Sequence, residues 1–226
     1  MKNAIGWIGT GVMGQSMASH LMEAGQPLRV HNRTKDKAMP LIERGAKWCE
    51  TPAEVAMGSR YVFTIVGFPT DVEEVFLGKE GILSGADQDA ILIDMTTSEP
   101  ALAERIHTEA AAKGMSALDA PVSGGDLGAR NASLAIMVGG DRPAFEQTLP
   151  LFETMGENIA YFGPAGSGQR VKMSNQILIA TTMIGVVESL LYATKAGLEM
   201  NEVIDLIGQG AAGCWSINNL GRRIAL

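Results

Sequence analysis

Three glycines near the N-terminus have the spacing of a phosphate-binding loop. Gly9, Gly11 and Gly14 follow the apolar run Ala4–Ile8 and precede a stretch whose apolar residues recur every four positions. A strand before and a helix after such a G-x-G-x-x-G pattern are the context expected for dinucleotide binding, with the pyrophosphate at the helix N-terminus. The alternative is a glycine-rich turn without a ligand. We predict cofactor contacts from Gly9, Thr10, Gly11, Val12, Met13 and Gly14.

The end of the second predicted strand indicates which dinucleotide is bound. Leu28–His31 reads as a strand and leads into Asn32, Arg33 and Thr34, about twenty residues beyond the glycines, where the adenosine ribose is recognised. NAD enzymes usually carry an acid there, whereas the guanidinium of Arg33 suits the 2′-phosphate of NADP. We therefore predict NADP, with NAD also possible, and with Asn32 and Thr34 adding hydrogen bonds. The alternative for Arg33 is a solvated arginine at a strand end.

A lysine near the start of a long predicted helix could transfer a proton. Lys172 and Asn175 are three residues apart and share one helix face, and Gln176 follows directly. We expect Gly168, one turn earlier, to leave room for a ligand beside Lys172. Next to a nicotinamide, the ammonium could protonate a carbonyl oxygen as hydride arrives. Taken alone, however, such a lysine is more often a solvated helix residue.

A serine followed by two glycines could hold a carboxylate. Ser123, Gly124 and Gly125 lie in a predicted loop between strands at Met115–Asp119 and Ser133–Val138. Adjacent glycines allow backbone N–H groups to point into a cleft. As an isolated tripeptide this sequence is more often only a loop.

The elements around these residues predict an α/β fold with a doubly wound, mostly parallel sheet. Further strands are expected at Tyr61–Val66, Ala90–Asp94 and Asn158–Phe162. The segments after the strands then lie at the carboxyl edge of the sheet, where ligands of open α/β sheets bind. Ser98 is expected to cap the helix that Pro100 begins. Pro40 should kink or restart a helix over Thr34–Arg44.

A helical second domain is expected after the sheet. Ser167 to about Lys195 contains no proline and is apolar on most sides, so this helix of about 40 Å must be covered by other elements or another subunit. We predict domains at 1–163 and 164–226, and a homodimer or higher homo-oligomer through the long helix. Further helices are expected at Asn201–Ile207 and Ile217–Leu226. Because apolar residues continue to Leu226, the helical domain is expected to be truncated.

Composition excludes several kinds of partner. A net charge of −7 argues against nucleic acid, because phosphate binding needs a basic face. The longest apolar stretch, Ile177–Val187, is shorter than the ~20 residues that cross a bilayer, so no membrane partner is expected. Cys49 and Cys214 are far apart and no export signal is evident, which favours the cytoplasm. No histidine spacing suggests a metal site.

Four motifs taken together resemble the β-hydroxyacid dehydrogenase family, which includes 3-hydroxyisobutyrate dehydrogenases and tartronate semialdehyde or glyoxylate reductases. They are Gly9–Gly14, Asp119–Gly125, Ile136–Gly140 and Gly166-x-Gly168-x-x-x-Lys172-x-x-Asn175, and the match runs along essentially the whole chain. The resemblance implies a Rossmann domain followed by an all-helical domain. It also implies hydride transfer between NAD(P) and a small 3-hydroxy acid or semialdehyde acid.

The resemblance assigns roles to individual residues. It implies Lys172 as the acid/base catalyst, with Asn175 orienting it or the substrate. Ser123, Gly124 and Gly125 would bind the substrate carboxylate. Thr97 and the turn formed by Val66, Gly67, Phe68 and Pro69 would contact the cofactor.

The chain departs from the family pattern at two places. Gln176, a predicted substrate contact, stands where the family usually has a second asparagine, and the helices expected after Leu226 are absent. These departures motivate an alternative, a non-catalytic dinucleotide-binding module that acts through protein partners. Retention of Lys172 and of Ser123–Gly125 argues against it.

Overall fold

The computed structural model describes residues 4–226. These divide into two compact units between Lys172 and Met173. The division falls inside helix α9 (Ser167–Lys195). The first six residues of α9 therefore belong to the unit that contains the sheet. The domain boundary at 163/164 stays a prediction.

A nine-stranded sheet forms the first unit, with the order β3-β2-β1-β4-β5-β6-β8-β7 and with β9 beside β8. All pairings are parallel except those of β8 with β6 and β7. The strands are β1 (Ala4–Ile8), β2 (Leu28–His31), β3 (Lys47–Trp48), β4 (Ser59–Thr64), β5 (Ile91–Asp94), β6 (Ser116–Asp119), β7 (Val122–Ser123), β8 (Leu134–Gly140) and β9 (Gly156–Tyr161). The predicted mostly parallel Rossmann sheet is confirmed.

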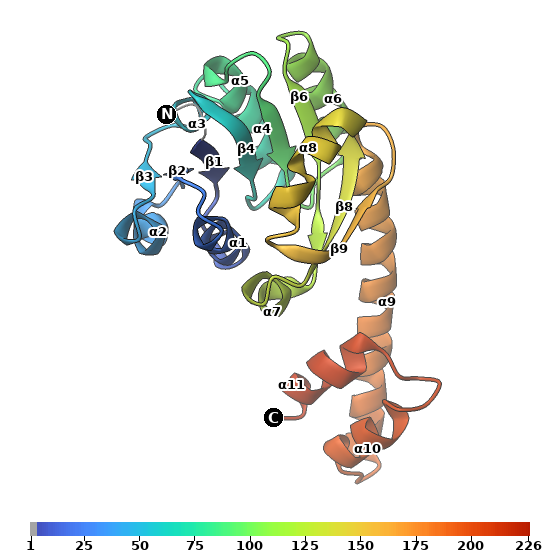
Figure 1. Ribbon diagram of the computed structural model, residues 1–226. Coiled ribbons are helices and arrows are strands. Elements are labelled where there is room, and N and C mark those ends of the chain that lie inside the picture. The colour runs from blue at the N-terminus through green and yellow to red at the C-terminus, as the bar shows by residue number, and fades with distance from the viewer. Residues whose placement is uncertain (1–3) are drawn as a thin grey trace. The chain divides into compact units, whose positions relative to one another are not determined.

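Helices cover both faces of this sheet (Figure 1). They are α1 (Val12–Glu23), the 3₁₀ turn η1 (Lys35–Ala38), α2 (Met39–Glu43), α3 (Pro52–Ala56), α4 (Pro69–Leu77), α5 (Ile82–Gly85), α6 (Pro100–Ala111), α7 (Gly125–Arg130) and α8 (Arg142–Phe152). Because side chains alternate along a strand, Ile91 and Ile93 enter one core and Leu92 enters another. The first core contains residues of α1 and α8, and the second contains residues of α4 and α6. The sheet is thus buried on both sides, which explains its continuous apolar strands.

Local sequence signals place several elements correctly and misplace others. Pro40 restarts the helix as predicted, because η1 gives way to α2 with this proline in its first turn. Ser98 does not cap α6: Glu99 occupies that position, and the hydroxyl of the buried Ser98 has no hydrogen-bond partner among residues 4–226. The expected loop around Ser123 instead contains β7 and the start of α7.

The second unit is helical, as predicted. It contains the rest of α9 with α10 (Met200–Ile207), the π-helical turn η2 (Ser216–Gly221) and α11 (Arg222–Ile224). Its core joins Val186 and Leu190 of α9 to Ile204 and Ile217. The buried Val186, Leu190 and Ala193 of α9 are four and three residues apart, as expected for one helix face.

Helix α9 is also long and apolar enough, by length and composition alone, to cross a membrane. The expectation that no segment reaches this length is therefore wrong. It rested on uninterrupted apolar residues, whereas the helix stays apolar on average across its threonines and Gly185. Val186 and Leu190 nevertheless pack into a protein core.

Candidate active site

The glycine loop between β1 and α1 has the geometry that its three glycines predict. Gly9 has a φ of +97°, and a β-carbon there would lie 1.9 Å from the carbonyl oxygen of Ile65. A β-carbon on Gly14 would lie 2.0 Å from the carbonyl oxygen of Gly9, so the helix packs closely on the strand. A β-carbon on Gly11 would meet nothing within 4 Å. Gly9 and Gly14 thus serve the turn and the packing, while Gly11 leaves open space.

The polar groups of this loop fit a dinucleotide pyrophosphate. The hydroxyl of Thr10 is buried and has no hydrogen-bond partner among residues 4–226. No side chain caps the N-terminus of α1, so its first amides are available to an anion. The amide of Thr10 donates to Oδ1 of Asn32 (3.0 Å), which fixes the loop to the end of β2. The open side at Gly11 gives the ligand access.

The predicted ribose-binding residues after β2 lie in different surroundings. Asn32 uses its side chain within the protein, since Nδ2 also donates to the carbonyl oxygen of Thr34 (2.8 Å). The side chain of Arg33 is 88% exposed and its Nη1 lies 3.2 Å from Oδ1 of Asp71. Asp71 in turn accepts a hydrogen bond from the amide of Phe68 (3.1 Å). Asp71 therefore brings Arg33 close to the turn that precedes α4, although these two segments are far apart in the sequence.

The loops that follow β4 and β5 are joined by a buried threonine. The amide of Val66 donates to Oγ1 of Thr96 (3.0 Å), and the amide of Thr96 donates to Oδ1 of Asp94 (3.0 Å). Thr97 next to it is exposed, as are Gly67 and Phe68 in the neighbouring loop. The predicted cofactor contacts Phe68 and Thr97 thus stand on two linked loops at the carboxyl edge of the sheet.

The start of α9 is anchored to the end of β6 by one carboxylate. Oδ1 of Asp119 accepts from the amide of Gly166 and Oδ2 accepts from the amide of Gln169, both at 2.8 Å. A β-carbon on Gly168 would lie 2.3 Å from the carbonyl oxygen of Met137. Gly168 is therefore required by the approach of the helix to the sheet. The expectation that it leaves room for a ligand beside Lys172 is not supported by this packing.

Lys172 is buried one turn after this anchor, with 7% of its surface exposed. Its ammonium forms no hydrogen bond or ion pair with a side chain in the described part of the chain, residues 4–226. Burial lowers the pKa of this amine because desolvation penalises the charged form. Lys172 is thus not the solvated helix lysine of the alternative interpretation, and its proton is easier to release than that of a surface lysine.

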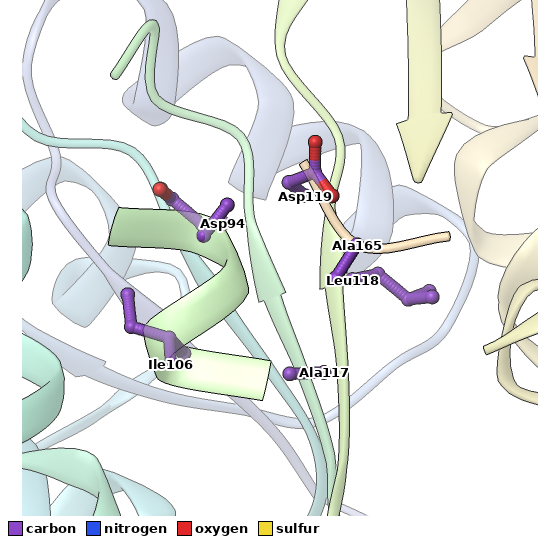
Figure 2. Close-up of a pocket in the computed structure, with 7 residues that line it drawn as sticks. Asp94, Ile106, Ala117, Leu118, Asp119 and Ala165 are labelled. Carbon is purple, nitrogen blue, oxygen red and sulfur yellow. The ribbon is translucent and has the colours of Figure 1, made fainter. Parts of the chain in front are cut away.

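Two buried aspartates occupy paired positions at the ends of β5 and β6. Asp94 and Asp119 are register partners, and Figure 2 shows both lining a small pocket with Ala165. Burial raises the pKa of Asp94 to about 7, with a smaller contribution from the charge of nearby Asp119 and against the lowering effect of hydrogen bonds from Thr96. Burial also raises the pKa of Asp119, against the lowering effect of the hydrogen bonds from Gln169 and Gly166. Sequence reasoning gave neither aspartate a role, and its one signal was Asp119 at the start of a family motif.

The predicted substrate-binding residues fall in both units. Gly124 and Gly125 have φ values of +135° and +63°, and a β-carbon on Gly125 would meet nothing within 4 Å. Ser123, at the end of β7, is half-buried. Asn175 and Gln176 belong to the second unit, where Nδ2 of Asn175 donates to Oε1 of Gln176 (3.1 Å).

Family models match both parts of the chain. Residues 4–163 match the NAD binding domain of 6-phosphogluconate dehydrogenase. Residues 166–226 match a domain described as NAD-binding of NADP-dependent 3-hydroxyisobutyrate dehydrogenase. The two matches follow each other in the order that the sequence motifs predict.

Individual proteins are similar over almost the whole chain. The "uncharacterized oxidoreductase YkwC" of Bacillus subtilis (strain 168) is 54% identical over 99% of this chain and 78% of its own length. The "probable 3-hydroxyisobutyrate dehydrogenase-like 1, mitochondrial" of Arabidopsis thaliana is 52% identical over 97% of this chain and 66% of its own length.

A solved structure of 3-hydroxyisobutyrate dehydrogenase from Mycobacterium tuberculosis with L-serine has a TM-score of 0.85 and 30% identity. The match covers 97% of this chain and 74% of that one. These similarities agree with the geometry of the chain, which has a glycine loop suited to a dinucleotide and a buried lysine on a helix anchored to the sheet. The chain belongs to the β-hydroxyacid dehydrogenase family of NAD(P)-dependent oxidoreductases.

Proposed function

We propose that the protein transfers hydride between NADP(H) and a small 3-hydroxy acid or its semialdehyde, with Lys172 as the general acid/base. The observation that carries this proposal is the burial of the Lys172 side chain, 7% exposed, with no partner side chain for its ammonium among residues 4–226. Desolvation of an amine costs free energy, and side chains with perturbed pKa values cluster at functional sites. The lowered pKa of Lys172 suits reversible proton transfer. The family membership supplies the class of reaction.

The proton chemistry is assigned to Lys172. When bound, the nicotinamide supplies or accepts the hydride at the substrate carbon. In reduction, the Lys172 ammonium gives its proton to the carbonyl oxygen, which becomes the hydroxyl of the product, and the neutral amine is reprotonated from solvent. In oxidation, the neutral amine takes the hydroxyl proton. A lowered pKa makes the neutral amine more accessible than in a surface lysine, which favours both directions.

The substrate carboxylate is assigned to Ser123, Gly124 and Gly125. The positive φ values of both glycines and the open space at Gly125 support a backbone site for an anion there. The L-serine named for the Mycobacterium tuberculosis structure is a small acid with a 3-hydroxyl group, which agrees with this class of substrate. We retain Asn175 and Gln176 as substrate-orienting residues, on their spacing from Lys172.

The preference for NADP is assigned to Arg33. Its exposed guanidinium is held near the Phe68 turn by Asp71, at the end of β2 where the ribose is recognised. The ion pair of the largely exposed Arg33 with the half-buried Asp71 lies at the surface and is weak enough for a phosphate dianion to compete. The description of the second matching domain as NADP-dependent supports the same choice.

Assembly and location remain proposals. Ile177, Leu178 and Ile184 of α9 are exposed in this chain although they are apolar. We propose that a second copy of the chain covers them, in a cytoplasmic homodimer or higher homo-oligomer, rather than a membrane. Both cysteines are free, which agrees with a reducing compartment.

A substrate panel tests the proposed function. The full chain is assayed for NADPH and NADH oxidation with glyoxylate and with succinic, tartronate and methylmalonate semialdehydes, and for cofactor binding by intrinsic fluorescence. The proposal predicts turnover of at least one semialdehyde acid, faster with NADPH. Cofactor binding without turnover of any of them would favour the non-catalytic binding module, which the family membership argues against.

A further inference from the structure

Gln169 uses both ends of its buried amide to join two segments that are far apart in sequence. Its side chain is completely buried. Nε2 donates to the carbonyl oxygen of Thr96 (2.7 Å), and Oε1 accepts from the amide of Ser98 (2.9 Å). One side chain therefore satisfies two backbone groups of the loop between β5 and α6. Such buried backbone groups need partners, so the contact is specific for an amide of this length.

The residue between these two backbone groups is Thr97. It is exposed while Thr96 and Ser98 on either side are buried, and it is a predicted cofactor contact. Because Gln169 binds the carbonyl group before Thr97 and the amide group after it, the backbone of Thr97 is fixed from both sides. The position of Thr97 at the sheet edge thus depends on Gln169.

The backbone of Gln169 is fixed to the sheet. The backbone amide of Gln169 donates to Oδ2 of Asp119 (2.8 Å), and Gly168 packs so closely that a β-carbon on it would lie 2.3 Å from the carbonyl oxygen of Met137. Gln169 precedes Lys172 by three residues on α9, so the two are neighbours on successive turns. Any displacement of Gln169 is passed to the helix turn that carries Lys172.

We infer that Gln169 is a positioning residue that sets the placement of Lys172 relative to the cofactor-contacting loop at Thr97. The inference rests on the proposed function of Lys172. Gln169 itself contacts neither substrate nor reacting atoms in this scheme. Its effect is geometric, and small errors in placement of a catalytic group are costly in rate.

Two variants separate this role from a general contribution to stability. Gln169→Leu keeps the volume and removes both side-chain hydrogen bonds to the loop. Gln169→Glu keeps the acceptor for the amide of Ser98 but donates to Thr96 only when the carboxyl group is protonated. The matched control is Thr148→Val, which removes a buried hydrogen bond to the carbonyl oxygen of Ala144 within α8 (2.8 Å), away from the α9 anchor.

The measurements are kcat and KM between pH 6 and pH 9, the dissociation constant for NADPH, and the unfolding midpoint. We expect Gln169→Leu to lower kcat by about tenfold or more and to weaken NADPH binding several-fold, because both Lys172 and Thr97 lose their placement. Thr148→Val should change neither value by more than about twofold, although it lowers the unfolding midpoint. Equal kcat and equal NADPH affinity in Gln169→Leu and Thr148→Val would overturn the inference.

The Glu variant adds a pH signature. A buried carboxyl group favours its protonated form, so Gln169→Glu should retain most activity relative to the parent protein at pH 6 and lose it towards pH 9. Gln169→Leu should show a deficit that does not depend on pH in this way. A deficit of the Glu variant that is constant across this range would also count against the inference.

A second readout keeps the inference separate from the proposed function. If the parent chain turns over no substrate, the proposed function fails, and the placement of Lys172 is then followed by trinitrobenzenesulfonate labelling with peptide mass spectrometry. Gln169→Leu should change the labelling rate of Lys172 and the NADPH dissociation constant, while Thr148→Val leaves both near the parent values. No change in either quantity would overturn the positioning role.

Discussion

Gly168 lies so close to the end of β6 that a β-carbon on it would come within 2.6 Å of the carbonyl oxygen of Asp119. The same β-carbon would also approach Oδ2 of the Asp119 carboxylate to 2.9 Å. This carboxylate binds the amides of Gly166 and Gln169, so the glycine and the aspartate together fix the turn of α9 that leads to Lys172. The contact between the start of α9 and the end of β6 thus determines where the proposed catalytic amine of Lys172 lies.

Gly168→Ala should therefore impair both stability and turnover. The methyl group meets backbone atoms that cannot move easily, which costs about 1–3 kcal/mol and displaces the start of α9. Gly185→Ala is the matched control on the same helix, because a β-carbon there meets nothing within 4 Å in the chain. Alanine at that position should raise the free energy of unfolding by about 1 kcal/mol. The free energy of unfolding in urea and kcat are measured for both variants. Equal values in Gly168→Ala and Gly185→Ala would contradict the claim that Gly168 anchors the start of α9.

Gly11→Ala should weaken cofactor binding without harming the fold. Gly11 has open space around it and a φ of −73°, which alanine adopts freely. Its methyl group would occupy space that the pyrophosphate needs, so we expect the NADPH dissociation constant to rise by about tenfold, equivalent to 1.4 kcal/mol.

The contrasting variant is Gly9→Ala, whose β-carbon would clash with Ile65. It should lower the unfolding midpoint even without ligand. Fluorescence titration and thermal unfolding separate the two effects. Unchanged NADPH affinity in Gly11→Ala would mean that the pyrophosphate binds elsewhere.

Arg33→Asp should discriminate between the two cofactors. Loss of the guanidinium and gain of a carboxylate act on the 2′-phosphate, which NADH lacks, so the NADPH dissociation constant should rise by about tenfold or more while that of NADH changes little. Arg44→Gln is a control at another exposed arginine, which is paired with Glu23. Parallel losses for NADPH and NADH in Arg33→Asp would show that Arg33 does not recognise the phosphate.

Asp94 should make the fold less stable as pH rises towards neutrality. Its pKa is about 7 in the folded protein against 3.8 for an unperturbed aspartate, so the folded state holds the proton more tightly between these values. The unfolded state then binds fewer protons, and the free energy of unfolding contributed by this group falls as pH rises from about 4 to about 7.

Asp94→Asn removes this dependence and keeps an oxygen acceptor for the amide of Thr96. The variant should gain stability relative to the parent across that pH range, by on the order of 3 kcal/mol. Urea unfolding at several pH values measures this difference in the free energy of unfolding between Asp94→Asn and the parent. A stability difference between the two proteins that does not vary with pH would mean that the carboxyl group titrates normally.

Much of this architecture follows from local sequence signals. The bounds of β1, β2 and α9 coincide with those predicted, because apolar runs, glycines and the absence of proline act within a few residues. The roles of Gly9 and Gly14 were also predictable, since the fingerprint fixes a turn and a packing contact. The spacing singled out Lys172, and the family resemblance added its role as acid/base catalyst.

Other features depend on contacts between distant segments. The two-residue strand β3 (Lys47–Trp48) is defined only by its pairing with β2. The caps and anchors at Ser98, Asp119 and Gln169 join residues 47 to 73 positions apart, and no local pattern marks them. Ser98 was expected to act through its hydroxyl, whereas its backbone amide makes the contact with Gln169.

The most direct test of the account is the turnover of Lys172→Ala. The Lys172→Ala variant and the control Lys195→Ala, at the exposed end of α9, are compared for single-turnover NADPH oxidation with the best semialdehyde of the panel and for NADPH affinity. We predict that Lys172→Ala lowers the rate by about 10²-fold or more with an NADPH dissociation constant near that of the parent, while Lys195→Ala is unaffected. Turnover of Lys172→Ala at the parent rate would contradict the account, because the proton would then come from another group.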